Sequence, residues 1–89
     1  MKTYNNRCWL NGDDSPSTGS IVAFDGIVKD KEGGDYRSTF LQIGDCFTKV
    51  KLHKASYDTM DDFICKMKKM RVVIDEFIEY LEKHKEERP

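Results

Sequence analysis

Residues 36–54 read YRSTFLQIGDCFTKVKLHK, and this stretch decides the fold. Apolar and polar residues alternate on both sides of the Gly44-Asp45 pair, which is typical of two half-buried β-strands. A glycine in the first of two loop positions indicates a type II′ hairpin turn, because that position needs a positive φ. The stretch therefore predicts antiparallel strands over residues 36–43 and 46–54.

The two-residue turn fixes which side chains share a face of the sheet. With Gly44 and Asp45 as the loop, Ile43 pairs with Cys46, and side chains alternate strictly along each strand. One face, the predicted core, carries Leu41, Ile43, Val50 and Leu52. The opposite face collects aromatic rings and cations, and these are the predicted binding residues: Tyr36, Phe40, Phe47, Lys49, Lys51 and His53.

Two interpretations of the aromatic and cationic face remain open. In the first, its rings stack on the bases of a single-stranded nucleic acid, for about 1–3 kcal/mol per base, and its cations hold phosphates. In the second, the cross-strand pairs stabilise a solvent-facing sheet by about 0.2–1 kcal/mol each. The chain has 15 Lys/Arg against 16 Asp/Glu, so phosphate binding would rest on a local patch of positive charge.

Two further strands are predicted before this hairpin. Residues 20–29 are rich in β-branched and aromatic side chains, and Gly26 among them indicates a bulge or a close approach of the backbone. Residues 3–10 predict a first strand, which places Arg7 and Trp9 on the same face. The chain between these strands, 11–19, consists of turn-forming residues and is expected to be a mobile loop.

A helix is predicted over residues 59–84, with Asp58 or Thr59 as its N-cap. Its apolar residues recur at spacings of three and four, as one face of a helix requires. They are Met60, Phe63, Met67, Met70, Ile74, Phe77 and Leu81. At 1.5 Å per residue the helix is about 38 Å long, which exceeds the width of under about 20 Å expected for four strands.

The surplus length and a widened apolar surface predict that this helix packs on more than one side. One side is expected to cover a face of the sheet, and the other to meet the same helix of a second chain. The predicted dimer interface consists of Met70, Val73, Phe77, Ile78, Tyr80 and Leu81. The alternative is a bend near Arg71 that folds the last two turns back onto a monomer.

The titratable residues favour neither an enzyme nor a metal site. The three cysteines and two histidines are scattered, without the close spacing of zinc ligands, and no cysteine has a base within reach. No cofactor motif is recognised. The odd cysteine count, the lack of an apolar leader and the lack of a run of about 18 apolar residues predict a cytoplasmic protein that does not enter the membrane.

The sequence thus predicts a single α+β domain over residues 1–89. Its antiparallel meander of three to four strands is followed by one long C-terminal helix packed on one face. This order is similar to that of a family of transcriptional coactivators that dimerise and bind single-stranded DNA, and the similarity covers about residues 20–84. The expected function is non-catalytic: a protein-interaction module, such as a regulator or inhibitor docking on a larger partner, and homodimeric through the helix. The alternative is a binder of single-stranded nucleic acid.

Overall fold

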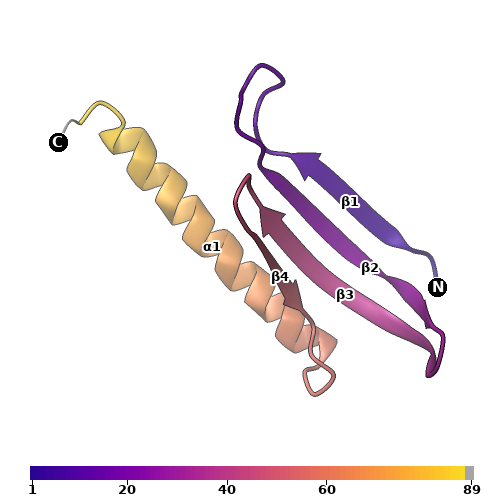
Figure 1. Cartoon of the computed structure of the whole chain (residues 1–89). Coiled ribbons are helices and arrows are strands. Elements are labelled where there is room, and N and C mark those ends of the chain that lie inside the picture. The colour runs from indigo at the N-terminus through magenta and orange to yellow at the C-terminus, as the bar shows by residue number, and fades with distance from the viewer. Residues whose placement is uncertain (88–89) are drawn as a thin grey trace. The chain divides into compact units, whose positions relative to one another are not determined.

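The computed structural model describes residues 1–87, and the chain forms two compact units that divide between Ala55 and Ser56. The first unit is a four-stranded antiparallel sheet in the order β1-β2-β3-β4, and the second contains one helix, α1 (Figure 1). The predicted α+β class and the meander are therefore confirmed. Residues 88 and 89 of the predicted domain lie outside the described part.

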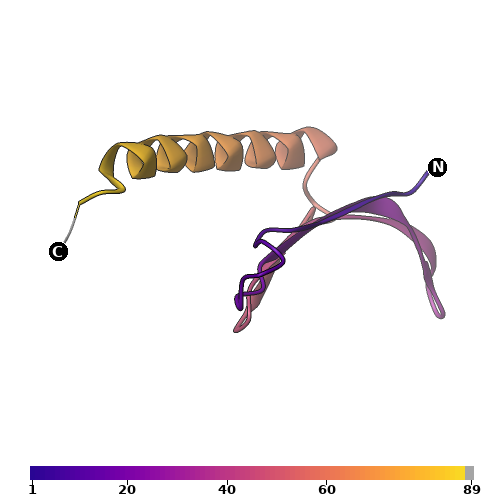
Figure 2. The ribbon, with the colours of Figure 1, turned by 90° about the horizontal axis from the view of Figure 1, so that it is seen from above.

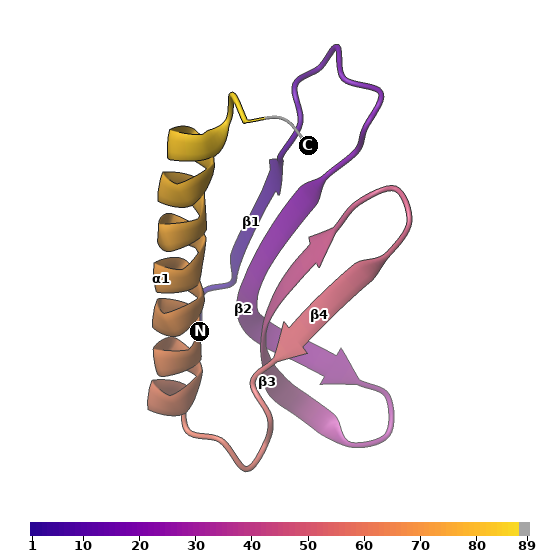
Figure 3. The same cartoon turned by 90° about the vertical axis from the view of Figure 1, so that its left-hand side faces the viewer.

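The sheet contains all four predicted strands. They are β1 (Tyr4–Trp9), β2 (Ser20–Asp30), β3 (Gly34–Gly44) and β4 (Lys49–His53). Because each strand runs antiparallel to the next, the β1–β2 and β3–β4 loops lie at the same end of the sheet (Figure 3). Seen edge-on, the sheet is bent (Figure 2). This arrangement places β1 and β4 at the two edges, with β2 and β3 between them.

The prediction of a two-residue turn at Gly44-Asp45 is wrong. Gly44 is the last residue of β3 and pairs with Lys49, so residues 45–48 form a longer loop. The Asp45 carboxylate accepts hydrogen bonds from the backbone N–H groups of Phe47 and Thr48, at 2.9 and 3.1 Å. These bonds also lower the pKa of Asp45. An aspartate that bonds the backbone two residues ahead stabilises its own turn, and here it replaces the glycine turn.

The longer loop shifts the pairing of β3 and β4 by four residues. Ile43 lies opposite Val50, and Leu41 lies opposite Leu52, where Cys46 and Thr48 had been expected. Because side chains alternate with a period of two, a shift of four leaves each side chain on its predicted face. The division of this hairpin into an apolar face and an aromatic, cationic face therefore survives the wrong turn.

The burial predicted for the apolar face differs from the structure. Ile43 is 36% exposed and Val50 is 54% exposed, whereas Val22, on the opposite face, is only 8% exposed. Val22 belongs to the inner strand β2, whereas Val50 belongs to the edge strand β4 and Ile43 lies one residue from the end of the inner strand β3. Position in the sheet thus contributes to burial together with the apolar character of the side chain.

The β2–β3 hairpin is longer than predicted. Its ladder continues to Asp30 and Gly34, so the connection between the strands predicted over 20–29 and 36–43 is reduced to residues 31–33. Gly34 has a φ of 80°, which glycine adopts without strain. The β2–β3 ladder is regular through Gly26, so the prediction of a bulge there is wrong. The other prediction for Gly26, a close approach to the backbone, is confirmed. A Cβ built on Gly26 would lie 3.0 Å from Thr3 Cγ2.

A bidentate ion pair joins β2 to β3 on the apolar face. Arg37 Nε and Nη2 donate to the two carboxylate oxygens of Asp25 at 2.9 and 2.7 Å, and the Thr39 hydroxyl donates at 2.8 Å. The bond from Arg37, followed by the bond from Thr39, lowers the pKa of Asp25 below its ordinary value of 3.8. Asp25 lies directly opposite Thr39 in the ladder, so the network favours this register.

This network predicts a specific loss of stability in acid. Since the folded pKa of Asp25 is depressed, its stabilisation is present above the unfolded value of 3.8 and is lost as the pH falls through the lower folded value. The variant Asp25→Asn should lack this part of the acid sensitivity. Denaturant unfolding at several values between pH 2 and 7 measures it, with Asp13→Asn in the β1–β2 loop as a control. An unchanged pH profile in Asp25→Asn would contradict the assignment.

The helix is confirmed as a single element, α1 (Met60–His84), capped by Thr59. Thr59 Oγ1 accepts from the backbone N–H of Asp62 at 3.0 Å, and the Asp62 carboxylate accepts from the backbone N–H of Thr59 at 3.0 Å. This reciprocal capping box satisfies two amides of the helix start. α1 continues without interruption past Arg71 (Figure 2). The alternative prediction, a bend near Arg71 that folds the last two turns of the helix back, is therefore wrong.

Removing this cap should destabilise the start of α1. Thr59→Ala is expected to lower the free energy of unfolding by about 1 kcal/mol, the usual cost of losing a threonine N-cap. Denaturant unfolding followed by helical circular dichroism measures the change. Ser56→Ala, an exposed hydroxyl outside the capping box, serves as the control. Equal stability of Thr59→Ala and the parent would contradict the role of the cap.

Candidate functional site

The aromatic and cationic residues lie on one face of the sheet, opposite to the face of Ile43 and Val50. Two rows of paired residues cross this face from β1 to β4. The first is Trp9–Ser20–Gly44–Lys49, and the second is Arg7–Val22–Gln42–Lys51. We call it the basic-aromatic face and define it by Arg7, Trp9, Phe24, Phe40, Lys49, Lys51 and His53. Its cations therefore lie on the two edge strands, and the rings of Phe24 and Phe40 lie on the two strands between them.

The charge of the basic-aromatic face is one-sided. Alternation assigns to it the cations Arg7, Lys49 and Lys51, whereas Asp30 is the one carboxylate that the four described strands place on the same side. Asp30 belongs to the far end of the β2–β3 hairpin, away from these cations. The net charge of the whole chain is −1, so this face is a local exception to its average charge.

Phe40 is the centre of a cluster of rings on this face. It stacks on Phe24 with ring centroids 5.2 Å apart and planes at 18°. His53, its partner in the ladder, lies at 5.7 Å with the planes tilted by 51°. Lys51 Nζ lies 4.2 Å from the Phe40 centroid, within the range of a cation–π interaction. These contacts hold Phe40, Lys51 and His53 together on the face.

A shallow depression of about 280 Å³ lies beside the first row, and Arg7, Trp9, Gln42 and Lys49 are among the residues lining it. It brings the cations of both edge strands and an exposed indole to one place on the sheet. The Asp45 carboxylate also lines it and opposes the positive charge there. The depression therefore combines an aromatic surface with amide, cationic and anionic groups.

Two of the predicted binding residues do not join this cluster. Phe47 belongs to the β3–β4 loop and is 94% exposed, because the strand expected from residue 46 begins at Lys49. Tyr36 lies opposite Val28, beyond the part of β3 that pairs with β4. Phe40, Lys49, Lys51 and His53 share the face as predicted. The predicted set is thus divided between the sheet, its loop and a distant part of β3.

Three residues of this face were not among the predicted binding residues: Arg7, Trp9 and Phe24. Alternation had placed Arg7 and Trp9 together, but their face becomes the basic-aromatic face only through the pairing of β1 with β2. That pairing depends on the length of the loop between them. The sequence signal for these residues is strand alternation, since the face carries the odd positions of β1 and β4 and the even positions of β2 and β3.

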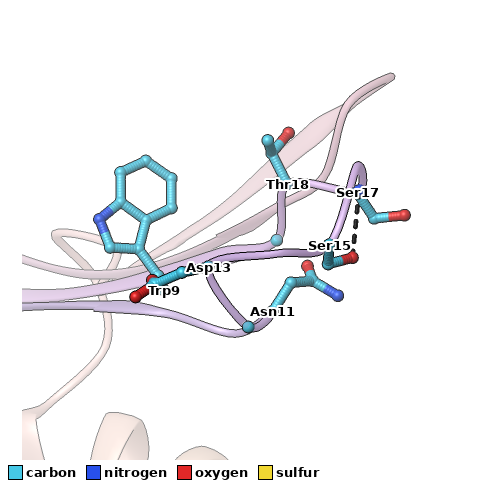
Figure 4. Close-up of a pocket in the computed structure, with 8 residues that line it drawn as sticks. Trp9, Asn11, Asp13, Ser15, Ser17 and Thr18 are labelled. Atoms are coloured by element: carbon cyan, nitrogen blue, oxygen red, sulfur yellow. Dashed lines mark hydrogen bonds between the residues drawn. The ribbon is translucent and has the colours of Figure 1, made fainter.

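A second pocket, also of about 280 Å³, lies in the β1–β2 loop (Figure 4). Trp9 stands at its edge, and Ser15 Oγ accepts a hydrogen bond from the backbone N–H of Ser17 at 3.2 Å (Figure 4). In the same loop, the Thr18 hydroxyl and backbone N–H lie 3.1 and 3.3 Å from Sγ of Cys46 in the β3–β4 loop, and these contacts lower the pKa of the Cys46 thiol. These polar contacts connect the two loops.

Helix α1 carries the second candidate surface. Its predicted interface residues are mostly exposed: Val73 is 65% exposed, Phe77 60% and Leu81 47%, and Ile78 and Tyr80 are exposed as well. Met70 is half-buried. Ile74, which continues the stripe between Met70 and Phe77, is also exposed. Tyr80 stacks on His84 at 4.3 Å within the helix. The C-terminal half of α1 thus presents a continuous apolar surface.

Residues 1–87 contain neither a cluster of metal ligands nor a helix that could span a membrane. No group of three or more His, Cys, Asp or Glu side chains is placed to hold a metal ion. No helix in the described chain is both long and apolar enough to cross a membrane. Comparisons of the chain with family models, with curated proteins and with solved structures gave no match.

Proposed function

We propose that this chain is a non-catalytic interaction domain that self-associates through α1. The observation that supports the proposal is the exposed apolar surface of the helix between Val73 and Leu81. Fully burying one large apolar side chain contributes about 1.5–3 kcal/mol, so covering several of them is strongly favourable. A second copy offers the same surface in the same orientation, which is how most symmetric dimers form.

The proposed dimer would act as a regulator or inhibitor that docks on a larger protein in the cytoplasm. Self-association through α1 leaves the four-stranded unit as the part of the chain that would meet that partner. Sedimentation velocity over a concentration series tests the first step of this proposal. A concentration-dependent dimer supports it, and a monomer at millimolar concentration contradicts it.

The basic-aromatic face supports a second candidate function, the binding of single-stranded nucleic acid. The specific observation is the combination of the Phe40 ring cluster with Arg7, Lys49 and Lys51 on the edge strands. Rings that stack on bases and cations that follow the backbone are the two elements of such binding sites. Titration with labelled single-stranded and double-stranded oligonucleotides at two salt concentrations tests it. Absence of binding at low salt contradicts this second candidate.

A further inference from the structure

Trp9 is the chain's single tryptophan, and its side chain is 66% exposed on the edge strand β1. Within residues 1–87 its indole stacks on no other ring and its ring N–H group donates no hydrogen bond. The ring stands clear of the other labelled side chains in Figure 4. Tryptophan joins a large apolar surface to a polar N–H group, and such side chains are enriched at binding interfaces. The indole is therefore open to a ligand on this side of the sheet.

The row of paired residues that contains Trp9 has small residues at its centre. Trp9 lies opposite Ser20, Ser20 lies opposite Gly44, and Gly44 lies opposite Lys49. A Cβ built on Gly44 would lie 2.7 Å from Lys49 Cγ, so the Lys49 side chain lies directly against the glycine. The depression of about 280 Å³ beside this row thus has an indole at one edge of the sheet and a lysine at the other.

The groups that line this depression suit a nucleic-acid base better than a phosphate. Beside the indole it contains the amide of Gln42, which both donates and accepts hydrogen bonds, and the carboxylate of Asp45. The backbone N–H groups of Phe47 and Thr48 lower the pKa of Asp45, so this carboxylate is charged at neutral pH. A carboxylate repels a phosphate, whereas it accepts hydrogen bonds from the N–H groups of a base.

Cations and a second aromatic surface lie in the next two rows. Arg7 and Lys51 stand at the two edges of the adjoining row, and the stacked pair Phe24 and Phe40 belongs to the row beyond it. The Trp9 row and the Phe24 row are four residues apart along the strands, which is about 13 Å. Bases inside a duplex are covered on both faces by their neighbours. Two separate aromatic surfaces therefore fit two bases of an unpaired strand, with its phosphates near the cations.

We infer that Trp9 and the depression beside it hold one unpaired base of a single-stranded nucleic acid. The base stacks on the indole, and the adjoining phosphates lie toward Arg7 and Lys49. The pair of Phe24 and Phe40 takes another base of the same strand. This inference rests on the second candidate function, and it adds the side chain that contacts the base and the place on the sheet where the base binds.

Intrinsic fluorescence tests this contact directly, because Trp9 is the chain's single tryptophan. A single-stranded oligonucleotide of about 12 nucleotides, within the usual size range of such sites, should quench the Trp9 emission saturably at low salt. Trp9→Ala removes the ring and should weaken binding about 5- to 150-fold, measured by fluorescence anisotropy of the labelled oligonucleotide. Trp9→Phe keeps a ring on which a base can stack and should bind within about threefold of the parent.

Tyr36→Ala is the matched control for the loss of an exposed ring. Tyr36 is 53% exposed and lies opposite Val28, at the far end of β3 from the depression. Alternation places it on the same side of the sheet as Phe40, so this variant removes an aromatic side chain without touching the proposed base site. It should keep the affinity of the parent and the full quenching of Trp9.

The outcomes separate this inference from the second candidate function. Binding in anisotropy with unchanged Trp9 emission, or with Trp9→Ala equal to the parent, overturns the inference and leaves that function standing. Equal losses in Trp9→Ala and Trp9→Phe also overturn it, because stacking needs only a ring. Absence of binding at low salt overturns both. Deoxyadenosine monophosphate, which reaches one aromatic surface only, should quench at much higher concentrations; quenching at the concentration of the oligonucleotide would overturn the assignment to a strand.

Discussion

The double variant Ile74→Asp/Phe77→Asp is expected to be monomeric at concentrations at which the parent chain is a dimer. Both side chains are exposed in the described chain and belong to the apolar stripe of α1. Losing the burial of two such side chains costs about 3–6 kcal/mol. At 1.4 kcal/mol per factor of ten, the dissociation constant should rise by at least about 100-fold. Sedimentation velocity or light scattering over a concentration series measures this change.

A matched variant on the other side of the helix separates loss of the contact from a general effect of charge. Cys65→Asp/Val72→Asp adds the same two charges at exposed positions of α1. Residues follow one another by about 100° around a helix, so Val72 lies well away from Ile74 and Phe77. This control should remain a dimer. If it dissociates as readily as Ile74→Asp/Phe77→Asp, or if the latter remains dimeric, the stripe is not the interface.

The helix could be predicted almost to the residue because its signals are local. The three-and-four spacing of Met60 to Leu81 defines a face within the element itself, and Thr59 caps the first turn through a hydrogen bond to a residue three positions away. The part of the meander from β2 to β4 was accessible in the same way, since these successive strands are separated by short loops and pair with one another. In each case the deciding interactions join residues that are close in the chain.

The β3–β4 turn could not be predicted because two local preferences compete there. Gly44 suits a tight turn, and Asp45 suits a longer loop closed by its own carboxylate. The residues next to the turn do not show which of the two preferences is stronger, because the pairing of β3 with β4 beyond the loop also contributes to the free energy of each arrangement. Pairing of Ile43 with Val50 and of Leu41 with Leu52 places apolar side chains opposite one another. The predicted register had paired Leu41 with Thr48, so the observed register gains apolar cross-strand contacts.

The composition of the basic-aromatic face depended on contacts that the sequence does not display. Trp9 and Lys49 are forty residues apart in number, yet they lie in one row because three strand pairings connect them. Each pairing has its own register, and an odd shift in any one of them would have moved Trp9 to the other face. Phe47 was wrongly predicted to lie in a strand, because the sequence of residues 46–48 is compatible with both a strand and a loop.

The basic-aromatic face gives the second large expected effect. If it binds single-stranded nucleic acid, the triple variant Arg7→Ala/Lys49→Ala/Lys51→Ala should lose binding by about 20-fold or more at 50 mM salt. Each phosphate contact on a single strand contributes about 0.7 to the slope of log affinity against log salt. Three lost contacts should therefore reduce that slope by about 2. Fluorescence anisotropy of a labelled oligonucleotide between 50 and 200 mM salt measures both quantities.

The control for this variant changes the net charge equally but leaves the face intact. Lys29→Ala/Lys31→Ala/Lys85→Ala removes three cations from the β2–β3 hairpin and from beyond the end of α1. A site formed by Arg7, Lys49 and Lys51 predicts that this control keeps the affinity and the salt slope of the parent. Equal losses in both variants would mean that the oligonucleotide responds to total charge. Because the chain as a whole is slightly acidic, such a response could not sustain binding at physiological salt.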